Sequence, residues 1–425
     1  LMPLYKMKKI AYLLAFVFIA SAFTTATIYP IDGYEYTGIK RLKRLERIKN
    51  GEIKDNTVIP PGAMKSMLDI QLNLLTNVED SVGYFLKPNE KFQKEINALF
   101  GSLSKNYSIS VLDITNLDSI RYAEKNPLAG YQPGSVGKIA VLVALFEQLA
   151  NIYPDSYEDR VALLKSKHVK SGVWGLTDTH TVPIYDVEKN VLVKRQVIAS
   201  DVFSLFEWAD HMMSVSNNGA ASIVWREALL MAAFGDKYPA LTEEEALNYF
   251  KTTPKKELTD LGNDVVNLPL RKLGISSDEW RLGSFFTGGA NTYVGDKGGS
   301  TGTTRGLMKF LVQMEQGKVV DTKSSLEMKR LMYMTDRRIR YAQSPSLKEA
   351  AVYFKSGSLY KCDRSKGEAC GKYMGNVTNY MNSVAIVEHT DNTCYMVVLM
   401  SNVLRKNSAS DHMALASSID KIIRK

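Results

Sequence analysis

Segments with strand character stand near both ends of the chain, and helical patterns fill the region between them. The strand-like segments are rich in β-branched and aromatic residues and lie at 107–114, 120–124, 350–360, 381–389 and 394–401. A helical pattern at 411–423 closes the chain. This order predicts an α+β fold in which strands from both ends build one mixed-order antiparallel sheet flanked by helices. A large helical lobe, inserted at about 135–343, is expected to form a cleft against that sheet.

Helical periodicity marks four further segments, at 39–48, 64–77, 90–100 and 202–215. The first of them carries basic residues around an apolar face. It could lie on an anionic membrane surface, but packing on the main body with a solvated basic face is favoured. No pair of strands is predicted between 135 and 343.

The helix that opens the middle region carries a serine and a lysine one turn apart. Pro133 and Gly134 interrupt the chain, and apolar residues then recur with helical spacing from Ile139 onward. Ser135 therefore stands near a helix N-terminus with Lys138 three residues on, a spacing that stacks both side chains on one face. The amine could take the proton of a serine nucleophile, and helix N–H groups favour an oxyanion. A capping serine followed by a solvated lysine would show the same pattern.

Two later segments offer polar groups of the kind that such a nucleophile needs. After the helical pattern at 202–215, Ser216 and Asn218 either end the helix in a left-handed turn or point into the cleft. The strand at 350–360 contains Lys355-Ser356-Gly357. A lysine on an edge strand is a common device against aggregation. Alternatively, the lysine and serine hold a carboxylate, the glycine admits a ligand close to the backbone, and the next N–H, of Ser358, completes an oxyanion hole.

Together and in this order, the three elements resemble the serine β-lactamase and penicillin-binding protein superfamily, whose motifs are S-x-x-K, S-x-N and K-T/S-G. The likeness includes PGSVGK opening an apolar helix, SVSNNGAAS ending a Met-rich helix and FKSG on a late strand. Gly302-Thr303-Thr304 also matches the start of the helix that class A members place before their last strands. The resemblance covers about 104–424 and implies a β-lactamase-like fold, with class A as the nearest relation.

The resemblance also implies catalytic roles. Ser135 would be the acylated nucleophile, Lys138 its base or proton relay, and Ser216 the group that passes a proton toward the leaving nitrogen. The backbone N–H groups of Ser135 and Ser358 would form the oxyanion hole. Because Lys138 and Lys355 share one partly desolvated cleft, each is expected to favour the neutral form of the other, which suits a lysine base near neutral pH.

Substrate binding is assigned on the same grounds. Asn218 would bind the side-chain amide of the substrate, and Lys355, Ser356 and Gly357 would hold its carboxylate. No cofactor is expected, and because no histidine pairs with another at ligand spacing, no metal site is expected either.

The resemblance fails at the deacylating base. Class A β-lactamases use a glutamate, on the loop before the Gly302 helix, to position the water that hydrolyses the acyl-enzyme. The corresponding segment, 280–304, contains no glutamate. Glu244 starts an E-x-x-L-N string of the family type, but it stands in what looks like an ordinary amphipathic helix. Hydrolysis is therefore expected to be slow or to use another group, such as Lys138 or Asp296.

A second candidate nucleophile is Ser300, in a G-x-S-x-G string typical of α/β-hydrolases. That chemistry requires a buried strand immediately before the serine and a helix after it. The preceding segment is short, glycine-rich and polar, which favours a flexible loop with Thr303 or Thr304 capping the next helix.

The start of the chain has the pattern of an export signal. Basic residues precede an apolar run at 10–23 that contains the small-residue site Ala20-Ser21-Ala22. An uncleaved membrane anchor is the alternative. The expected organisation is a signal or anchor at 1–26, a helical extension at 27–103, and a serine hydrolase domain at 104–425, with strands within 104–126 and 350–403.

Charge and cysteine content indicate which partners and disulfides to expect. A net charge of +9 is mild for 425 residues, and no basic stretch carries interleaved aromatic residues, so nucleic acid is not an expected partner. Three cysteines do not suggest a disulfide scaffold, although Cys362 and Cys370 could close a short polar loop in an oxidising compartment.

These observations favour an exported hydrolase or acyl-transferase of the periplasm or cell envelope of a bacterium. It would form an acyl-enzyme on Ser135 with a β-lactam or a D-Ala-D-Ala-type peptidoglycan stem. A penicillin-binding D,D-peptidase is the first alternative. A sensor or binding domain that is acylated once or never is another, and an esterase using Ser300 is a third. The oligomeric state stays open.

Overall fold

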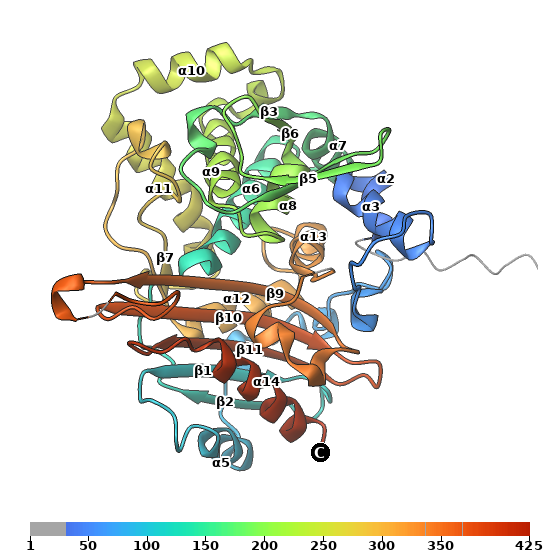
Figure 1. Cartoon of the computed structure of the whole chain (residues 1–425), viewed down its shortest axis with the longest axis vertical. Coiled ribbons are helices and arrows are strands. Elements are labelled where there is room, and N and C mark those ends of the chain that lie inside the picture. The colour runs from blue at the N-terminus through green and yellow to red at the C-terminus, as the bar shows by residue number, and fades with distance from the viewer. Residues whose placement is uncertain (1–30, 336, 368) are drawn as a thin grey trace, which may run out of the picture.

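The computed structural model describes residues 31–335, 337–367 and 369–425. The export signal or anchor expected at 1–26, with its apolar run at 10–23, lies outside the described residues. The described part of the chain forms a sheet layer with a helical lobe above it (Figure 1).

A five-stranded antiparallel sheet joins the two ends of the chain, which confirms the predicted α+β fold. The strand order is β2-β1-β11-β10-β9. The strands are β1 (Tyr107–Asp113), β2 (Arg121–Lys125), β9 (Ala351–Lys361), β10 (Thr378–Glu388) and β11 (Cys394–Asn402). Because β1 pairs with β11, the N-terminal hairpin and the C-terminal strands share one sheet. Strand β9 forms the edge nearest the helical lobe (Figure 1).

Both faces of the sheet are buried, because successive side chains of a strand point to opposite sides. On β11, Val397 belongs to the core beneath two terminal helices, and its neighbour Val398 belongs to the core shared with the lobe. The two helices that cover the first face are α5 (Glu90–Ala98) and α14 (Ala409–Ile423).

The lobe is built around one apolar helix that begins at Lys138. The stretch Gly134–Ile152 is long and apolar enough to cross a membrane, but 72% of its most apolar window is buried inside the protein. It is therefore the core helix of the lobe. The principal lobe helices are α6 (Lys138–Ile152), α8 (Leu205–Met213), α9 (Asn218–Phe234), α11 (Lys255–Lys272), α12 (Thr304–Glu315) and α13 (Thr322–Met332). The remaining α-helices of the described residues are α2 (Tyr34–Thr37), α3 (Lys40–Lys49), α4 (Val82–Phe85), α7 (Tyr157–Ser166) and α10 (Glu243–Thr252).

The prediction that the lobe contains no strand pair is wrong. Three short antiparallel pairs occur there, and the longest is a hairpin that projects from the lobe (Figure 1). The pairs are β3 (His168–Lys170) with β6 (Val202–Ser204), β4 (Val182–Asp186) with β5 (Val191–Arg195), and β7 (Trp280–Arg281) with β8 (Thr301–Gly302). Strands of two to five residues are too short for alternating polarity to show in the sequence.

The helix expected at 64–77 is also absent from the structure. Only a short 3-10 turn, Leu75–Asn77, forms near its end. The segment instead makes contacts with distant elements: the Asn73 amide donates to Glu388, and the Asn73 N–H donates to the buried Glu315. These tertiary contacts outweigh the weak local preference for a helix.

The basic helix α3 packs on the main body, as the favoured alternative predicts. Leu42 and Leu45 are buried beneath it. On its other sides, Arg44 is paired with Asp55, and Arg47 donates to the Tyr185 hydroxyl at 2.7 Å. These two arginines are therefore engaged within the protein.

Arg41 of α3 ties the N-terminal extension to the end of α8. Its Nε and Nη2 atoms each lie 2.6 Å from a carboxylate oxygen of Asp210, and both side chains are buried. A third guanidinium nitrogen donates to the Thr335 hydroxyl at 3.2 Å. The extension is thus bonded to the helix that leads into Ser216.

Replacing Arg41 by methionine is expected to destabilise the protein by about 3 to 5 kcal/mol, because the buried Asp210 carboxylate loses its charged partner. Urea unfolding followed by circular dichroism measures this. Lys43→Met, which removes a more exposed ion pair with Glu46 on the same helix, is the matched control with an expected loss below about 1 kcal/mol. Equal losses in the two variants would contradict the prediction.

A disulfide joins Cys362 to Cys370 and closes the polar loop that the sequence marks between them. The loop lies in the connection between β9 and β10. Cys394 is buried and unbonded to sulfur.

Candidate active site

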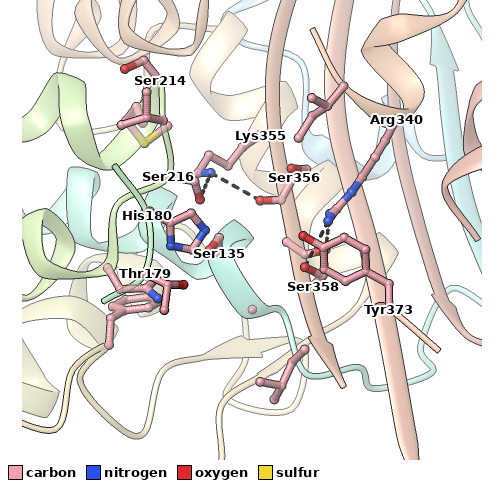
Figure 2. A pocket seen from close by; sticks show the side chains of 18 of the residues that line it. Ser135, Thr179, His180, Ser214, Ser216, Arg340, Lys355, Ser356, Ser358 and Tyr373 are labelled. Atoms are coloured by element: carbon pink, nitrogen blue, oxygen red, sulfur yellow. Dashed lines mark hydrogen bonds between the residues drawn. The ribbon is translucent and has the colours of Figure 1, made fainter. Parts of the chain in front are cut away.

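A cavity of about 760 Å³ lies between the helical lobe and strand β9. Ser135, Ser216, Asn218 and the run from Lys355 to Ser358 all line it. Figure 2 shows Ser135 and Ser216 on one side of the cavity and Ser356 and Ser358 on the other, with Lys355 of β9 directed toward Ser216. The structure therefore brings together the residues that the sequence marks in three separate segments.

The turn before α6 presents Ser135 to the cavity. Residues Gly134–Gly137 form a 3-10 turn that continues directly into α6. Gly134 has φ 53°, a left-handed conformation that favours glycine. The turn places the Ser135 Oγ 3.0 Å from the Nζ of Lys138, the first residue of the helix.

Lys138 is fully buried and surrounded by oxygen atoms. Its Nζ lies 2.6 Å from the Ser216 carbonyl oxygen and 2.7 Å from the Asn218 Oδ1. Both of these oxygens only accept hydrogen bonds. A neutral amine has two N–H donors and one lone pair. With both donors engaged, the lone pair of neutral Lys138 is left for the Ser135 hydroxyl.

The surroundings favour that neutral form. Burial, followed by the charge of Lys355, lowers the pKa of Lys138 well below its usual value, and the Asp178 carboxylate opposes this shift. Burial and the nearby Arg340 guanidinium lower the pKa of Lys355 to about 7. The expected effect of Lys355 on Lys138 is therefore present, whereas the pKa of Lys355 is lowered by burial and Arg340 rather than by Lys138.

Ser216 connects the two lysines. Its Oγ lies 2.8 Å from the Lys355 Nζ and 3.3 Å from the Lys138 Nζ. Ser216 has φ 59°, so the left-handed turn forms and the hydroxyl still enters the cavity. Next to it, Asn217 caps α9 by accepting the Ala220 N–H at 2.7 Å. The turn thus holds the Ser216 hydroxyl between the amines of Lys138 and Lys355.

Strand β9 lies directly against the nucleophile turn, which is the Gly134–Gly137 turn that carries the candidate nucleophile Ser135. A Cβ atom on Gly357 would come within 2.1 Å of the Pro133 carbonyl oxygen and 2.9 Å of the Ser135 nitrogen. A Cβ atom on Gly134 would lie 2.9 Å from the Ser358 nitrogen. The contact brings the backbone nitrogens of Ser135 and Ser358 to one place, as an oxyanion hole formed by these two groups requires.

Arg340 is a site residue that the sequence analysis missed. It is buried, lines the cavity, and donates to the Gly357 carbonyl oxygen at 2.9 Å and to the Ser358 hydroxyl at 3.0 Å. Figure 2 shows it beside Tyr373 at the far side of β9. It begins the short 3-10 helix Arg340–Gln343, and no motif surrounds it, so the sequence carries no signal for its place.

The loop at 280–304 forms an apolar wall of the cavity. Leu282, Phe285 and Phe286 line it, and the Phe286 ring centre lies 5.2 Å from the Lys138 Nζ. Among the described residues that line the cavity there is no carboxylate.

The carboxylates considered as substitutes for the missing glutamate are not at the site. Glu244 is exposed in the first turn of α10, at the far end of the lobe in Figure 1. Asp296 is exposed and does not line the cavity. The E-x-x-L-N string is therefore an amphipathic helix start with a Thr242–Glu245 capping box, and Glu244 and Asp296 as deacylating bases are wrong.

Ser300 lacks the setting of a hydrolase nucleophile. It precedes the two-residue strand β8, and its Oγ accepts the Gly283 N–H at 3.1 Å. Thr303 caps α12 by accepting the Gly306 N–H at 3.0 Å, which confirms the predicted cap. The buried strand that this chemistry needs before the serine does not occur here.

Metal-ligating side chains do not cluster anywhere in the described part of the chain. The side chains that line the cavity include hydroxyl, amine, amide, imidazole and guanidinium groups.

Comparisons with known proteins identify a matching family and similar structures. The model of a family described as "Beta-lactamase enzyme family" matches residues 91–423. No curated protein matches the sequence. A class A beta-lactamase from Bacteroides cellulosilyticus DSM 14838 has a similar structure, with a TM-score of 0.51 and 16% identity over 79% of this chain and 97% of that chain.

Two further solved structures match the chain. TLA-3 extended-spectrum beta-lactamase has a TM-score of 0.53 and 14% identity, over 79% of this chain and 99% of that chain. A variant of PBP-A in an acyl-enzyme complex with penicillin G has a TM-score of 0.49 and 14% identity, over 80% of this chain and 98% of that chain. The likeness at these identities concerns the fold.

Proposed function

The chain belongs to the beta-lactamase enzyme family, and from this we propose that it forms an acyl-enzyme on Ser135 with a β-lactam or a D-Ala-D-Ala-type peptide. The observation that carries the proposal is the 3.0 Å approach of the Lys138 Nζ to the Ser135 Oγ, with the other two amine positions engaged by acceptors. A solvated lysine near a capping serine would not be buried in this way.

Acylation proceeds in two steps. Neutral Lys138 takes the hydroxyl proton of Ser135 while Oγ attacks the acyl carbon, and the backbone N–H groups of Ser135 and Ser358 receive the developing oxyanion. The intermediate then collapses as the C–N bond breaks. Ser216 gives its proton to the leaving nitrogen and takes one from Lys138, so the proton lost by the nucleophile ends on the leaving group.

The charges around the cavity support an anionic acyl donor. Arg337, Arg340, Lys355 and Lys372 line it, and no carboxylate does so among the described residues. A cleft lined by one sign of charge attracts ligands of the opposite sign. Lys355 and Ser356 are proposed to bind the carboxylate that β-lactams and D-Ala-D-Ala stems both carry, and Asn218 the side-chain amide.

Export is proposed together with this activity. The N-terminal pattern predicts it, and the Cys362–Cys370 bond supports it because disulfides persist in oxidising compartments. The periplasm or cell envelope of a bacterium is the compartment where peptidoglycan stems occur.

Binding of the carboxylate should weaken as the pH rises. Because the pKa of Lys355 is lowered to about 7, its ammonium is present below that pH and lost above it. The affinity for an anionic acyl donor is expected to fall about tenfold between pH 6 and pH 8. The concentration dependence of acylation measures this. An ester without the carboxylate should show no such fall, and the same affinity at both pH values for the anionic donor would contradict the prediction.

Intact-protein mass spectrometry of the full chain after mixing with penicillin G tests the proposed function. An added penicilloyl mass on the wild type and not on Ser135→Ala supports it. An adduct on both proteins would contradict Ser135 as the nucleophile. No adduct and no drug consumption would contradict the β-lactam part, and a D-Ala-D-Ala peptide assayed by release of D-alanine then separates a D,D-peptidase from a protein that never reacts.

A further inference from the structure

His180 enters the cavity from the loop before β4 and has no role in the proposed acylation. It lines the cavity together with Ser135 and Ser216. Figure 2 shows its ring projecting into the end of the cavity where Ser135 and Ser216 lie. Its side chain is 43% exposed, so water and ligands can reach it.

Asp178 holds one side of the His180 ring. The Asp178 Oδ1 lies 2.7 Å from the ring Nδ1 and accepts the backbone N–H of His180 at 3.2 Å. A carboxylate accepts hydrogen bonds, so the neutral imidazole carries its proton on Nδ1 and its lone pair on Nε2. The structure shows no hydrogen-bond partner for Nε2 within the described ranges. The lone pair is therefore available in the cavity.

Asp178 is itself held by hydrogen bonds to Asn218, on the turn that carries Ser216. Its Oδ2 accepts the Asn218 N–H at 2.5 Å, and its Oδ1 lies 3.3 Å from the Asn218 amide nitrogen. The His180 carbonyl oxygen accepts from the Asn217 amide at 3.1 Å. Burial opposes ionisation of Asp178, but the hydrogen bonds from His180 and Asn218 outweigh it and lower the pKa of this carboxyl.

The backbone around the pair is held in an unusual conformation. Thr177 has φ 71°, which is rare for a β-branched residue. Its hydroxyl accepts the Gly288 N–H at 3.2 Å, which ties this loop to the 280–304 loop. Strained backbone of this kind persists where the surrounding structure over-determines it, often beside functional groups.

We propose that His180 is the general base that activates the acceptor for attack on the acyl-enzyme, with Asp178 fixing its tautomer. This inference rests on the proposed acyl-enzyme. Nε2 takes the proton of an attacking water or amine while the acceptor atom bonds to the acyl carbon. The bond between the acyl carbon and Ser135 Oγ then breaks, and Oγ takes a proton from the imidazolium, so atoms and charge balance. The pair would supply what a glutamate on the 280–304 loop supplies in class A β-lactamases.

Charged groups on neighbouring elements also surround His180. Asp178 acts from its own loop, Lys138 from α6 interacts with the Asp178 charge, and Lys355 of β9 lies on the same cavity. The carboxylate stabilises the imidazolium that forms on proton transfer, as in other carboxylate–histidine pairs.

Decay of the penicillin adduct tests the proposal. The full chain is acylated with penicillin G, excess drug is removed, and the penicilloyl mass is followed over time. His180→Gln should slow decay at least about 100-fold, and more than it slows acylation. His168→Gln, an exposed histidine on β3, is the matched control.

Two additions separate the possible acceptors and roles. Decay in buffer alone identifies water, and decay that requires added D-alanine, with the amide product seen by mass, identifies an amine; both should depend on His180. Added imidazole should restore decay to His180→Ala, which a merely structural role would not allow. Equal decay in His180→Gln and wild type, or a wild-type adduct that neither acceptor removes, overturns this inference alone. No adduct on the wild type overturns the proposed function with it.

Discussion

Replacing Lys138 by methionine is expected to lower the rate of Ser135 acylation about 10³-fold. No other amine or imidazole lies within hydrogen-bond distance of the Ser135 Oγ among the described residues. The nucleophile would therefore lose its proton acceptor. Acylation by penicillin G, timed by intact mass, measures the loss, and thermal unfolding checks that the variant is folded.

The arginine variant of the same residue separates charge from basicity. Lys138→Arg keeps a cation, but a guanidinium does not become neutral in proteins and cannot accept the proton. It should therefore be as slow as Lys138→Met. Acylation by Lys138→Arg at near wild-type rate would show that the site needs only a positive charge. In the wild type the acylation rate should rise with pH through the lowered pKa of Lys138, because only the deprotonated amine is active.

Gly357→Ala is expected to reduce acylation by about 10² to 10³-fold, the loss typical of removing one oxyanion-hole donor. The added methyl group would stand 2.1 Å from the Pro133 carbonyl oxygen, and that oxygen belongs to backbone that cannot rotate away. The Asn382 amide holds the same turn, through the carbonyls of Gln132 and Pro133 at 2.9 and 3.0 Å. Strand β9 must then retreat, which separates the N–H groups of Ser135 and Ser358.

The control for this substitution is Gly299→Ala. No heavy atom lies within 4 Å of a Cβ at Gly299, and its φ is not in the left-handed region. Acylation rates of the two variants at saturating penicillin give the comparison. Wild-type rates in Gly357→Ala would mean that β9 tolerates the methyl group and that its contact with the turn does not position the oxyanion donors.

The sheet and the three motif segments could be predicted from the sequence, for physical reasons. Strands of seven to eleven residues, such as β1 and β10, are long enough to show β-branched and aromatic character. The spacing between Ser135 and Lys138 fixes their approach through one helical turn, whatever the rest of the fold does. Local geometry of this kind can be predicted without the structure.

Two groups of the site could not be predicted from the sequence. Arg340 begins a short 3-10 helix and His180 lies on a loop, and the course of such short segments depends on contacts made elsewhere, such as Asp178 with Asn218. The predicted helix at 64–77 fails for the related reason that Asn73 bonds to Glu315 and Glu388, which are distant in sequence. Such contacts leave no periodicity for a pattern to detect.

The pairing of β1 with β11 bears on how the protein is made. Ile109 of β1 stands opposite Leu399 of β11, so β1 can pair with this strand only after almost the whole chain has been synthesised. Contacts between residues so far apart in the sequence slow folding, and a chain emerging from the ribosome would hold β1 and β2 without their central partner. The nucleophile turn, which rests on β9, likewise gains its support late. The arrangement of Ser135 against β9 that the proposed acylation requires would thus form only after almost the whole chain has been made.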